Sequence, residues 1–368
     1  MDFGSDHQPC WTAMRRLVEK KRGEKYHLIS MRIKICKPLS IYEIGQRENQ
    51  EDSLWPSAEA LTEDASLFIL CDGMGGHERG EVASQTVCRE MSEYITAHVH
   101  EGDVISDEMF VAALDAAYTA LDKLDNDAAK KMGCTLTFLC LHKGGCLMAH
   151  IGDSRIYHIR PQTKEILYCS RDHSLVQELY QMGEITYEQM RVHPRRNVIM
   201  RAVQPGKYYR MKADIAHTTD IKPGDYFYRC SDGMLEQMED EELLDVFCAN
   251  ASDDAIRSKL ENDTAYNKDN HTAFIIRVED VIAEEGDNLY PNDEATSRSN
   301  AIVIRREMEK REALRAAAVE TMPQPTQAQP EPSPAQAPAP QRNRAFAMWI
   351  WGIVAMIAIV ALVFLLVY

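Results

Sequence analysis

The sequence predicts an α+β domain in which antiparallel sheets stack on one another and helices cover them. Short apolar runs such as residues 67–71 have the length of buried strands. Residues 135–141 and 146–151 flank a Lys-Gly-Gly turn, which is the pattern of a hairpin. Residues 81–99 and 110–124 carry apolar side chains at helical spacing, as core-facing helices do. Strands in hairpins with pairs of helices between them are typical of stacked sheets under helices.

The remaining elements follow in chain order. Residues 1–30 are polar and lack the apolar core of a signal peptide, so we expect them to be disordered, or translation to start at Met31. Residues 41–55 resemble a strand, a turn and a second strand, and residues 185–204 an exposed, arginine-rich flap. Further strands are expected at 31–36, 156–159, 226–231 and 272–278, and short helices at 175–182, 243–249 and 255–260.

The composition is that of a globular protein in a reducing compartment. The chain has 368 residues, of which 45% are hydrophobic and 27% charged. A net charge of −16 argues against non-specific binding to nucleic acid, which needs a basic surface. The ten cysteines form no CxxC pair and several lie inside apolar runs. They are therefore expected to be small core residues rather than zinc ligands or disulfides.

Four carboxylates stand at the ends of strand-like runs: Asp72, Asp153, Asp232 and Asp269. Each could simply begin a turn, because Asp-Gly is a common turn pair. If the strands bring these groups together, their mutual repulsion raises their pKa values, and a bound divalent cation removes the conflict. Ligation by oxygen atoms alone suits magnesium or manganese rather than zinc.

The C-terminal part of the chain predicts a membrane anchor. Residues 282–321 are charged and contain an alanine-rich stretch, 305–319, that predicts an exposed helix. Residues 322–345 are rich in proline and form an expected linker. Residues 346–368 carry no charge and are long enough for a transmembrane helix. By the positive-inside rule, two arginines just before this segment predict that the large domain lies in the cytoplasm.

Short motifs occur in a fixed order along the chain. They are Arg47-x-x-Gln50-Glu51-Asp52, Asp72-Gly73-Met74-Gly75-Gly76, Gly133-Cys134-Thr135, Gly152-Asp153-Ser154-Arg155, Asp172-His173-Ser174, His193-Pro194-Arg195-Arg196-Asn197, Ser231-Asp232-Gly233 and Asp269-Asn270. Single motifs of this kind arise by chance, but the ordered set is specific. Over residues 31–281 the chain resembles the metal-dependent Ser/Thr protein phosphatases of the type 2C class in their bacterial form.

This resemblance implies a four-layer α-β-β-α sandwich of two antiparallel sheets flanked by helices, to which the transmembrane helix would be added. It implies a protein-serine/threonine phosphatase that uses two or three Mn²⁺ or Mg²⁺ ions and attacks phosphoserine or phosphothreonine with a water bridging two ions. The expected partners are phosphorylated proteins, including a membrane Ser/Thr kinase that the enzyme opposes and its targets.

The resemblance also implies roles for particular residues. Asp72 would bridge two metal ions, with the backbone carbonyl of Gly73 on one ion and Asp232 and Asp269 on the other. Asp153 would join Asp232 at a third ion. Glu51 and Asp52 would orient metal-bound water molecules. Arg47 would bind the phosphate, because the two parallel donors of a guanidinium group match phosphate oxygens.

Two positions depart from the family pattern. Gln50 replaces the usual asparagine, and Met74 stands where eukaryotic members often have the histidine regarded as the general acid. A thioether cannot donate a proton, so His77 and His193 are alternative donors, although each is more simply a surface histidine. Two other functions stay open. One is a pseudophosphatase that binds phosphoproteins without hydrolysis, and the other is a sporulation-type phosphatase acting on a small regulator; Arg47 and the arginines of the flap favour the general signalling type over the latter.

Overall fold

The computed structural model describes residues 29–75, 79–100, 103–125, 131–285 and 294–321. One of its two large sheets has the strand order β11-β8-β7-β4-β3. Its centre is the predicted hairpin, in which Leu136 pairs with Ile151 and every residue of both strands is buried. The strands are β3 (Ser53–Trp55), β4 (Leu67–Cys71), β7 (Leu136–His142), β8 (Gly145–Ile151) and β11 (Asp214–Thr218).

The second sheet has the order β1-β13-β12-β9-β10, and β2 also pairs with β13. All pairings in both sheets are antiparallel, as predicted. The strands are β1 (Ile29–Ile35), β2 (Leu39–Glu43), β9 (Arg155–Arg160), β10 (Glu165–Cys169), β12 (Tyr226–Cys230) and β13 (His271–Glu285). A small separate sheet joins β5 (Gly73–Met74) to β6 (Gly133–Cys134).

The outer ends of β1 and β13 differ from the sequence-based boundaries. The prediction placed the first strand at 31–36 and let the pattern decay after residue 281, but Ile29 pairs with Glu285 and the ladder continues inward to Ile35. Glu279 and Asp280 are exposed within this two-stranded extension. These two acids interrupt the apolar run of β13, so the run alone does not indicate that the strand continues.

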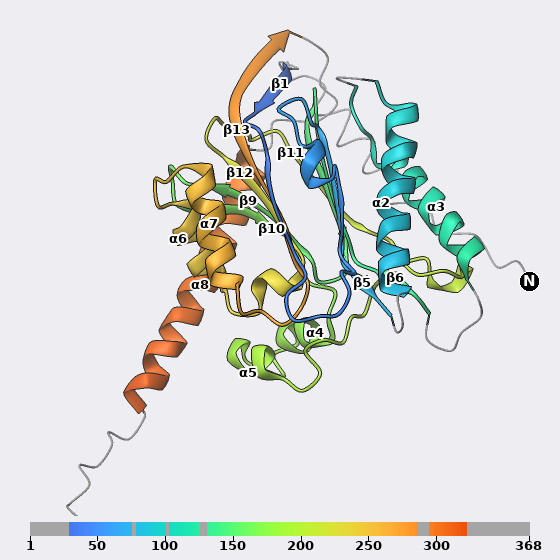
Figure 1. Cartoon of the computed structure of the whole chain (residues 1–368). Coiled ribbons are helices and arrows are strands. Elements are labelled where there is room, and N and C mark those ends of the chain that lie inside the picture. The colour runs from blue at the N-terminus through green and yellow to red at the C-terminus, as the bar shows by residue number, and fades with distance from the viewer. Residues whose placement is uncertain (1–28, 76–78, 101–102, 126–130, 286–293, 322–368) are drawn as a thin grey trace, which may run out of the picture. The chain divides into compact units, whose positions relative to one another are not determined.

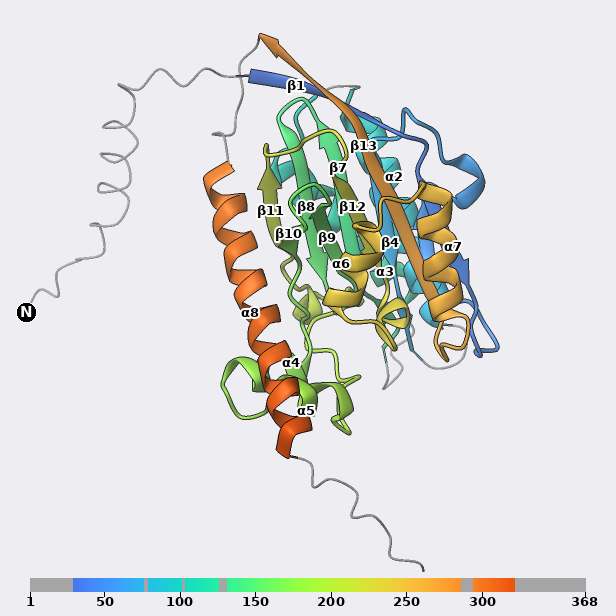
Figure 2. The same ribbon diagram turned by 90° about the vertical axis from the view of Figure 1, so that its left-hand side faces the viewer.

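Paired helices cover the outer face of each sheet (Figures 1 and 2). Two of them, α2 (Arg79–His98) and α3 (Asp107–Leu124), lie against the β7/β8 sheet, and α6 (Asp240–Phe247) and α7 (Asp253–Thr264) lie against the β12/β13 sheet. All four were predicted within a few residues. Short 3₁₀ turns occur at η1 (Ala58–Ala60), η2 (Lys207–Tyr209) and η3 (Asp232–Leu235).

Three apolar cores separate the four layers and confirm the predicted sandwich. One lies between α2/α3 and their sheet, around Met91, Phe110 and Phe138. A second lies between the two sheets, where the rings of Phe68 and Phe274 meet edge to face with centres 5.5 Å apart. The third lies under α6 and α7. Because both faces of each sheet are buried, the central strands read as continuous apolar runs.

Two further parts complete the described chain. The segment between β10 and β11 carries α4 (Leu175–Gln181) and α5 (Tyr187–Val192), so the predicted flap contains a helix. The last helix, α8 (Glu294–Thr321), begins eleven residues before the alanine-rich stretch. It is divided at Leu314 between two compact units, Met1–Leu314 and Arg315–Tyr368, and all contacts discussed below belong to the first.

Within the described ranges, no helix combines the length and the apolar character needed to cross a bilayer. The predicted transmembrane segment (346–368), the predicted linker (322–345) and most of the predicted disordered extension (1–30) lie outside the described residues; of the extension only residues 29 and 30 are described, and they begin β1.

Candidate active site

The four carboxylates predicted at strand ends come together at one end of the sandwich. Asp72 directly follows β4, and Asp153 follows β8 after one glycine. Asp232 opens η3 just beyond β12, and Asp269 stands two residues before β13. Two of these strands belong to one sheet and two to the other, so the cluster is assembled across the junction of the sheets.

The electrostatics of Asp72 and Asp232 show how close these groups are. Burial and repulsion from four other aspartates raise the pKa of Asp72 well above its ordinary value. Burial, followed by repulsion from Asp269, raises the pKa of Asp232 to about 6, although a hydrogen bond with Asp72 acts against this. Asp72 and Asp232 therefore lie close enough to affect each other's ionisation, as the assignment of both to one metal centre requires.

Asp153 and Asp52 belong to the same cluster. Burial, with repulsion from Asp232, raises the pKa of Asp153 well above its ordinary value. Burial also raises the pKa of Asp52 to about 7, against hydrogen bonds that favour its charged form and with repulsion from Asp232 and Asp269. Oxygen Oδ1 of Asp52 and Oδ1 of Asp153 are buried without a hydrogen-bond partner among the described residues. Burying a carboxylate oxygen without a partner costs free energy, and such oxygens are suitable ligands for a hard divalent cation.

Thr135 links the loops of Asp72 and Asp153. Its Oγ1 accepts a hydrogen bond from the amide of Asp72 (2.9 Å), and its own amide donates to the carbonyl of Asp72 (2.8 Å). The same hydroxyl lies 2.7 Å from Oγ of Ser154, the residue after Asp153. Sequence reasoning placed both residues in motifs but gave them no role.

Polar residues also fix the two acids expected to hold water. Ser231 Oγ donates to Asp52 Oδ2 (3.0 Å) and accepts from the amide of Thr272 (3.0 Å). Asn270 Oδ1 accepts from the amide of Glu51 (2.8 Å). Gln50 accepts from the amide of Asp52 through Oε1 (3.1 Å). The glutamine that departs from the family pattern therefore supports the loop, which no local pattern in the sequence indicated.

Gly73 sits where no side chain fits. A Cβ atom there would lie 2.4 Å from the carbonyl oxygen of Glu51 and 2.4 Å from the carbonyl carbon and oxygen of Gly80. The Gly73 amide donates to that Glu51 carbonyl (3.1 Å). This close approach brings the start of α2 and the first acidic motif against the Asp72 turn.

Arg47 reaches the edge of the cluster. Its Nη2 donates to Oδ2 of Asp269 (2.6 Å), and its side chain is 52% exposed. A half-exposed guanidinium next to the carboxylates can meet an incoming anion, which agrees with the expected phosphate contact.

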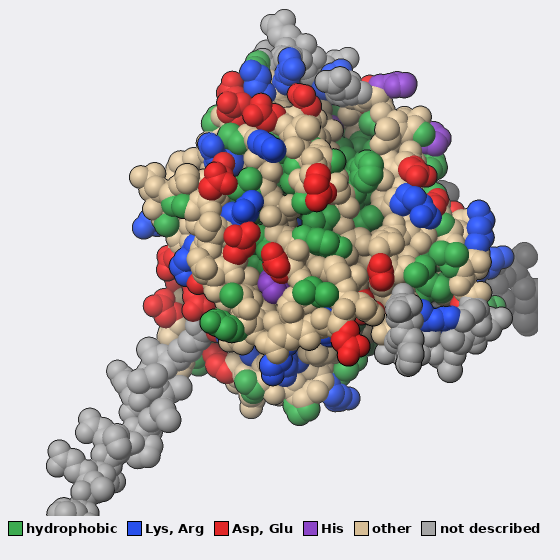
Figure 3. Space-filling view, in the orientation of Figure 1, with side chains coloured by type: hydrophobic (Ala, Val, Ile, Leu, Met, Phe, Trp, Pro, Cys, Tyr) green, Lys and Arg blue, Asp and Glu red, His purple; other side chains and the backbone are tan. Residues whose placement is uncertain are grey.

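A cleft of about 170 Å³ opens beside the cluster. It is lined by three of the predicted metal ligands, Asp153, Asp232 and Asp269, and by the flap residues Arg191 and Arg196. Figure 3 shows acidic and basic side chains interspersed over the face of the molecule drawn there. Of the two proton donors suggested by the sequence, His193 does not line this cleft, and His77 lies outside the described residues.

A different group has the tightest cluster of ligand atoms among the described residues. Suitable atoms of His150, His173 and Asp214 all lie within 4.8 Å of one another. However, the two imidazole rings stack with centres 4.5 Å apart and planes 16° apart, so their in-plane lone pairs cannot converge on one ion. The amide of Gly152 donates to His173 Nδ1 (3.1 Å), which leaves Nε2–H to donate to Asp214 (3.1 Å). This group holds the Asp153 loop.

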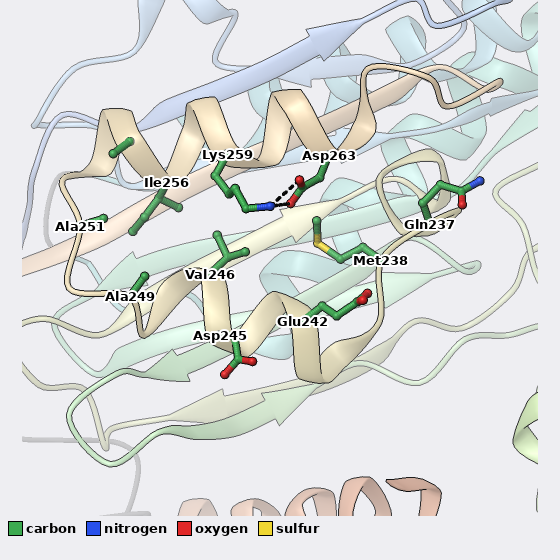
Figure 4. A pocket seen from close by; sticks show the side chains of 11 residues that line it. Gln237, Met238, Glu242, Asp245, Val246, Ala249, Ala251, Ile256, Lys259 and Asp263 are labelled. Carbon is green, nitrogen blue, oxygen red and sulfur yellow. Dashed lines mark hydrogen bonds and ion pairs between the residues drawn. The ribbon is translucent and has the colours of Figure 1, made fainter. Parts of the chain in front are cut away.

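A separate groove lies elsewhere, between α6 and α7 (Figure 4). It measures about 670 Å³ and is lined by apolar residues such as Met238, Val246 and Ile256. Its acids are peripheral and Asp263 is paired with Lys259 at 2.5 Å. Nothing in this groove resembles the carboxylate cluster.

Comparisons with known proteins agree with this geometry. The model of the protein phosphatase 2C family matches residues 44–262. Protein phosphatase PhpP of Streptococcus pneumoniae is 30% identical over 226 residues, which cover 60% of this chain and 88% of that protein. Serine/threonine protein phosphatase PstP of Mycobacterium tuberculosis is 31% identical over 291 residues, which cover 72% of this chain and 51% of PstP.

Solved structures share the fold. The M. tuberculosis phosphatase PstP superposes with a TM-score of 0.55 and 27% identity over 69% of this chain and all of that one. A structure of the catalytic domain of a serine/threonine protein phosphatase PstP, with a TM-score of 0.54 and 27% identity over 68% of this chain and all of that one, holds two manganese ions. PppA of Pseudomonas aeruginosa has a TM-score of 0.51 and 28% identity over 68% of this chain.

Proposed function

The chain belongs to the protein phosphatase 2C family and is a protein-serine/threonine phosphatase, and we propose that the carboxylate cluster around Asp72 is its active site. The observation that carries this proposal is the convergence of acidic residues from strand ends of both sheets, three of which, Asp153, Asp232 and Asp269, line one cleft. Carboxylates that repel one another cost free energy when they are brought together, and a bound cation removes that cost.

The cofactor is Mn²⁺ or Mg²⁺, in agreement with the two manganese ions in the structure of a PstP catalytic domain. Asp72, the carbonyl of Gly73, Asp232 and Asp269 would hold two ions, and Asp153 would add ligands for a third. A pair of such ions supplies hydroxide near neutral pH and neutralises charge on the phosphoryl oxygens. Glu51 and Asp52 would orient the water molecules of the site, which fits their fixed backbone hydrogen bonds.

The remaining residues of the cleft bind the substrate. Arg47 presents a planar fork of donors beside the cluster and would orient the phosphate of phosphoserine or phosphothreonine. The flap arginines Arg191 and Arg196 line the same cleft and would contact the protein part of the substrate. A pseudophosphatase is disfavoured, because the predicted metal carboxylates that line the cleft are all retained.

The test is the Asp72→Asn variant of the full chain, with Mn²⁺ added. Hydrolysis of a phosphothreonine peptide should fall more than about a hundredfold, because a ligand of both ions is lost. Without metal, the variant should melt at or above the wild-type temperature, since a repelled buried carboxylate has been removed. Added Mn²⁺ should raise the melting temperature of the wild type and much less that of the variant.

Asp64→Asn is the matched control, because Asp64 is exposed in a turn away from the cluster. It should behave as wild type in both measurements. Retention of substantial turnover by Asp72→Asn would reject the site assignment. A phosphotyrosine peptide hydrolysed as fast as the phosphothreonine peptide would reject the proposed substrate class.

We also propose a location and a physiological role. The uncharged segment 346–368 would anchor the enzyme in the membrane by a single C-terminal helix, with the catalytic domain in the cytoplasm. The proline-rich linker would let the domain reach phosphoproteins at the membrane surface, including a Ser/Thr kinase that it opposes and the targets of that kinase.

A further inference from the structure

Helix α8 touches the catalytic domain along one stripe. Ala301 is buried, Ile304, Met308 and Arg311 are partly buried, and residues between them such as Arg306 are exposed. Spacings of three, four and three residues keep these side chains on one face of a helix. Ile304 and Met308 pack against the core under α6 and α7. In Figure 2, α8 runs past the edge of the sheet toward α4 and α5.

The packing under α8 is incomplete. A cavity of about 500 Å³ lies between the helix, β10, α4 and α5. The helix is therefore held by separate side-chain contacts rather than by continuous packing. One of these contacts is an ion pair between Arg305 and Glu165, and the others nearest the flap are made by Arg311.

Arg311 joins two parts of the domain. Its Nη1 donates to Oδ2 of Asp240, the first residue of α6, at 2.9 Å. Its guanidinium carbon lies 3.8 Å from the centre of the ring of Tyr187, the first residue of α5. The Arg311 side chain is 13% exposed. A guanidinium that is shielded from water and lies over an aromatic ring is attracted more strongly than one at an exposed site.

Asp240 connects Arg311 to the cleft. Its Oδ1 accepts from the hydroxyl of Tyr157 (2.8 Å) and from Nη1 of Arg155 (3.3 Å). Arg155 also makes two hydrogen bonds to Asp172, of 2.7 and 2.8 Å. Both Arg155 and Asp172 line the cleft beside Asp153.

Tyr187 connects Arg311 to the flap. The flap shares a small core with α4, in which the buried residues are Val176 of α4 and Tyr187 and Met190 of α5. A core of this size cannot fix the flap alone, so its placement depends on contacts with the rest of the domain. These include the Arg311–Tyr187 contact and the ion pair between Arg191 and Glu239.

We infer that Arg311 is a positioning residue that docks α8 on the flap and so sets the flap over the substrate cleft. This inference rests on the proposed function of the cleft and adds to it. Arg311 lies on α8, after the last strand of the sandwich and outside the 44–262 match to the family model. A positioned flap should matter for the protein part of a substrate and little for the reacting phosphate.

The test compares Arg311→Ala, Arg311→Lys and the exposed control Arg306→Ala in the full chain with Mn²⁺. For a phosphothreonine peptide, KM should rise about five- to tenfold in Arg311→Ala with kcat changed less than about twofold. For a small aryl phosphate, kcat/KM should stay within about twofold of wild type. Arg311→Lys should fall between, because it keeps the charge but loses the stacked plane. Arg306→Ala should match wild type.

A second measurement does not depend on activity. Trypsin cleavage within the flap, at Arg195, Arg196 and Arg201, should become several-fold faster in Arg311→Ala at a temperature where its thermal unfolding curve shows a folded domain. Equal losses on both substrates would mean that Arg311 acts on the fold as a whole, which overturns the inference. Unchanged KM and unchanged cleavage would overturn it as well. Absence of wild-type hydrolysis would instead count against the proposed function, and the cleavage result would still decide the docking.

Discussion

Asp72 shows at the scale of one residue how the site depends on its surroundings. The carboxylate is half-buried with four other aspartates acting on it, and its backbone is held on both sides by Thr135. Its neighbours thus fix its position while destabilising its charge. We therefore expect the Asp72 side chain to hold its position without a metal ion, and its charged form to be strongly stabilised when a metal ion binds.

Gly73 gives a prediction at the same scale. In Gly73→Ala, the new methyl group would clash with the backbone of Glu51 and Gly80, which cannot move aside as a side chain can. We expect a loss of about 1–3 kcal/mol in the free energy of unfolding and loss of Mn²⁺-dependent hydrolysis. Urea unfolding and the peptide assay measure the two effects.

The control for this substitution is Gly183→Ala. Gly183 has φ +75° and no atom within 4 Å of an added Cβ, so it tests backbone strain without a clash. It should cost about 1 kcal/mol and leave hydrolysis intact. Wild-type stability and activity in Gly73→Ala would show that the turn can relax and that the close approach is not required.

At the scale of elements, the flap and α8 are where the sequence was least informative. The prediction described residues 185–204 as an exposed loop, yet Thr186 caps α5 with a capping box to Gln189. The alanine-rich stretch was expected to form an exposed helix, yet the preceding turns of α8 cover the domain through a stripe of few apolar residues. Short helices and sparse stripes carry weak periodic signals.

The β7–β8 hairpin gives a prediction about pH. His142 ends β7, where its Nδ1 accepts from the amide of Gly144 (3.0 Å). Burial, with a smaller contribution from His217, lowers the pKa of His142 to about 4 from 6.5. As the pH falls, His142 is therefore protonated in the unfolded chain before it is protonated in the folded chain. Its ionisation lowers the free energy of unfolding progressively between pH 6.5 and pH 4.

The variant His142→Asn keeps an acceptor but does not titrate in this range. Between pH 7 and pH 5, its free energy of unfolding should fall by about 2 kcal/mol less than that of the wild type. The comparison isolates the histidine, because the raised pKa values of the aspartate cluster act in the opposite direction in both proteins. Parallel curves for wild type and His142→Asn in urea unfolding would contradict the prediction.

At the scale of the whole molecule, the sandwich places the functional parts together. The two sheets present the ends of β4, β8 and β12, together with the start of β13, to one site, and the flap lies beside it. Helix α8 leads from the domain toward the expected linker, which would span at most about 75 Å in an extended polyproline form. The proposed anchor would therefore confine the enzyme near the membrane.

If the anchor serves to hold the enzyme at the membrane, its removal should leave activity in solution unchanged and reduce activity toward membrane proteins in cells. A chain that stops after Thr321 keeps α8 and should hydrolyse the phosphothreonine peptide as the full chain does. In cells, it should dephosphorylate membrane phosphoproteins more slowly, because their effective concentration is lost. Phosphoproteomics of the membrane fraction measures this difference.

The control adds an unrelated transmembrane helix after residue 345, which should restore the cellular effect. If the shortened chain alone dephosphorylates membrane proteins as the full chain does, tethering has no role. If the added helix fails to restore it, residues 346–368 act by something other than anchoring.

By itself, the sequence determined the features that local chemistry encodes. Apolar runs of strand length, the hairpin turn and the helical stripes follow from periodicity, and the carboxylates that end strands stand out because charge is costly there. The ordered motifs then identified the family and its metal chemistry before any fold was known.

Only the tertiary structure decided which distant groups meet. Ser231 donates to Asp52 from 179 positions away, Thr135 ties Asp72 to Ser154, and Arg311 joins Tyr187 to Asp240. These contacts arise when whole sheets and helices pack together. The spacing of residues along the chain does not indicate which of them will meet. The physical reason is that each of these residues stands in a sequence context found in many proteins. It becomes a structural contact only when the folded elements bury it beside its partner.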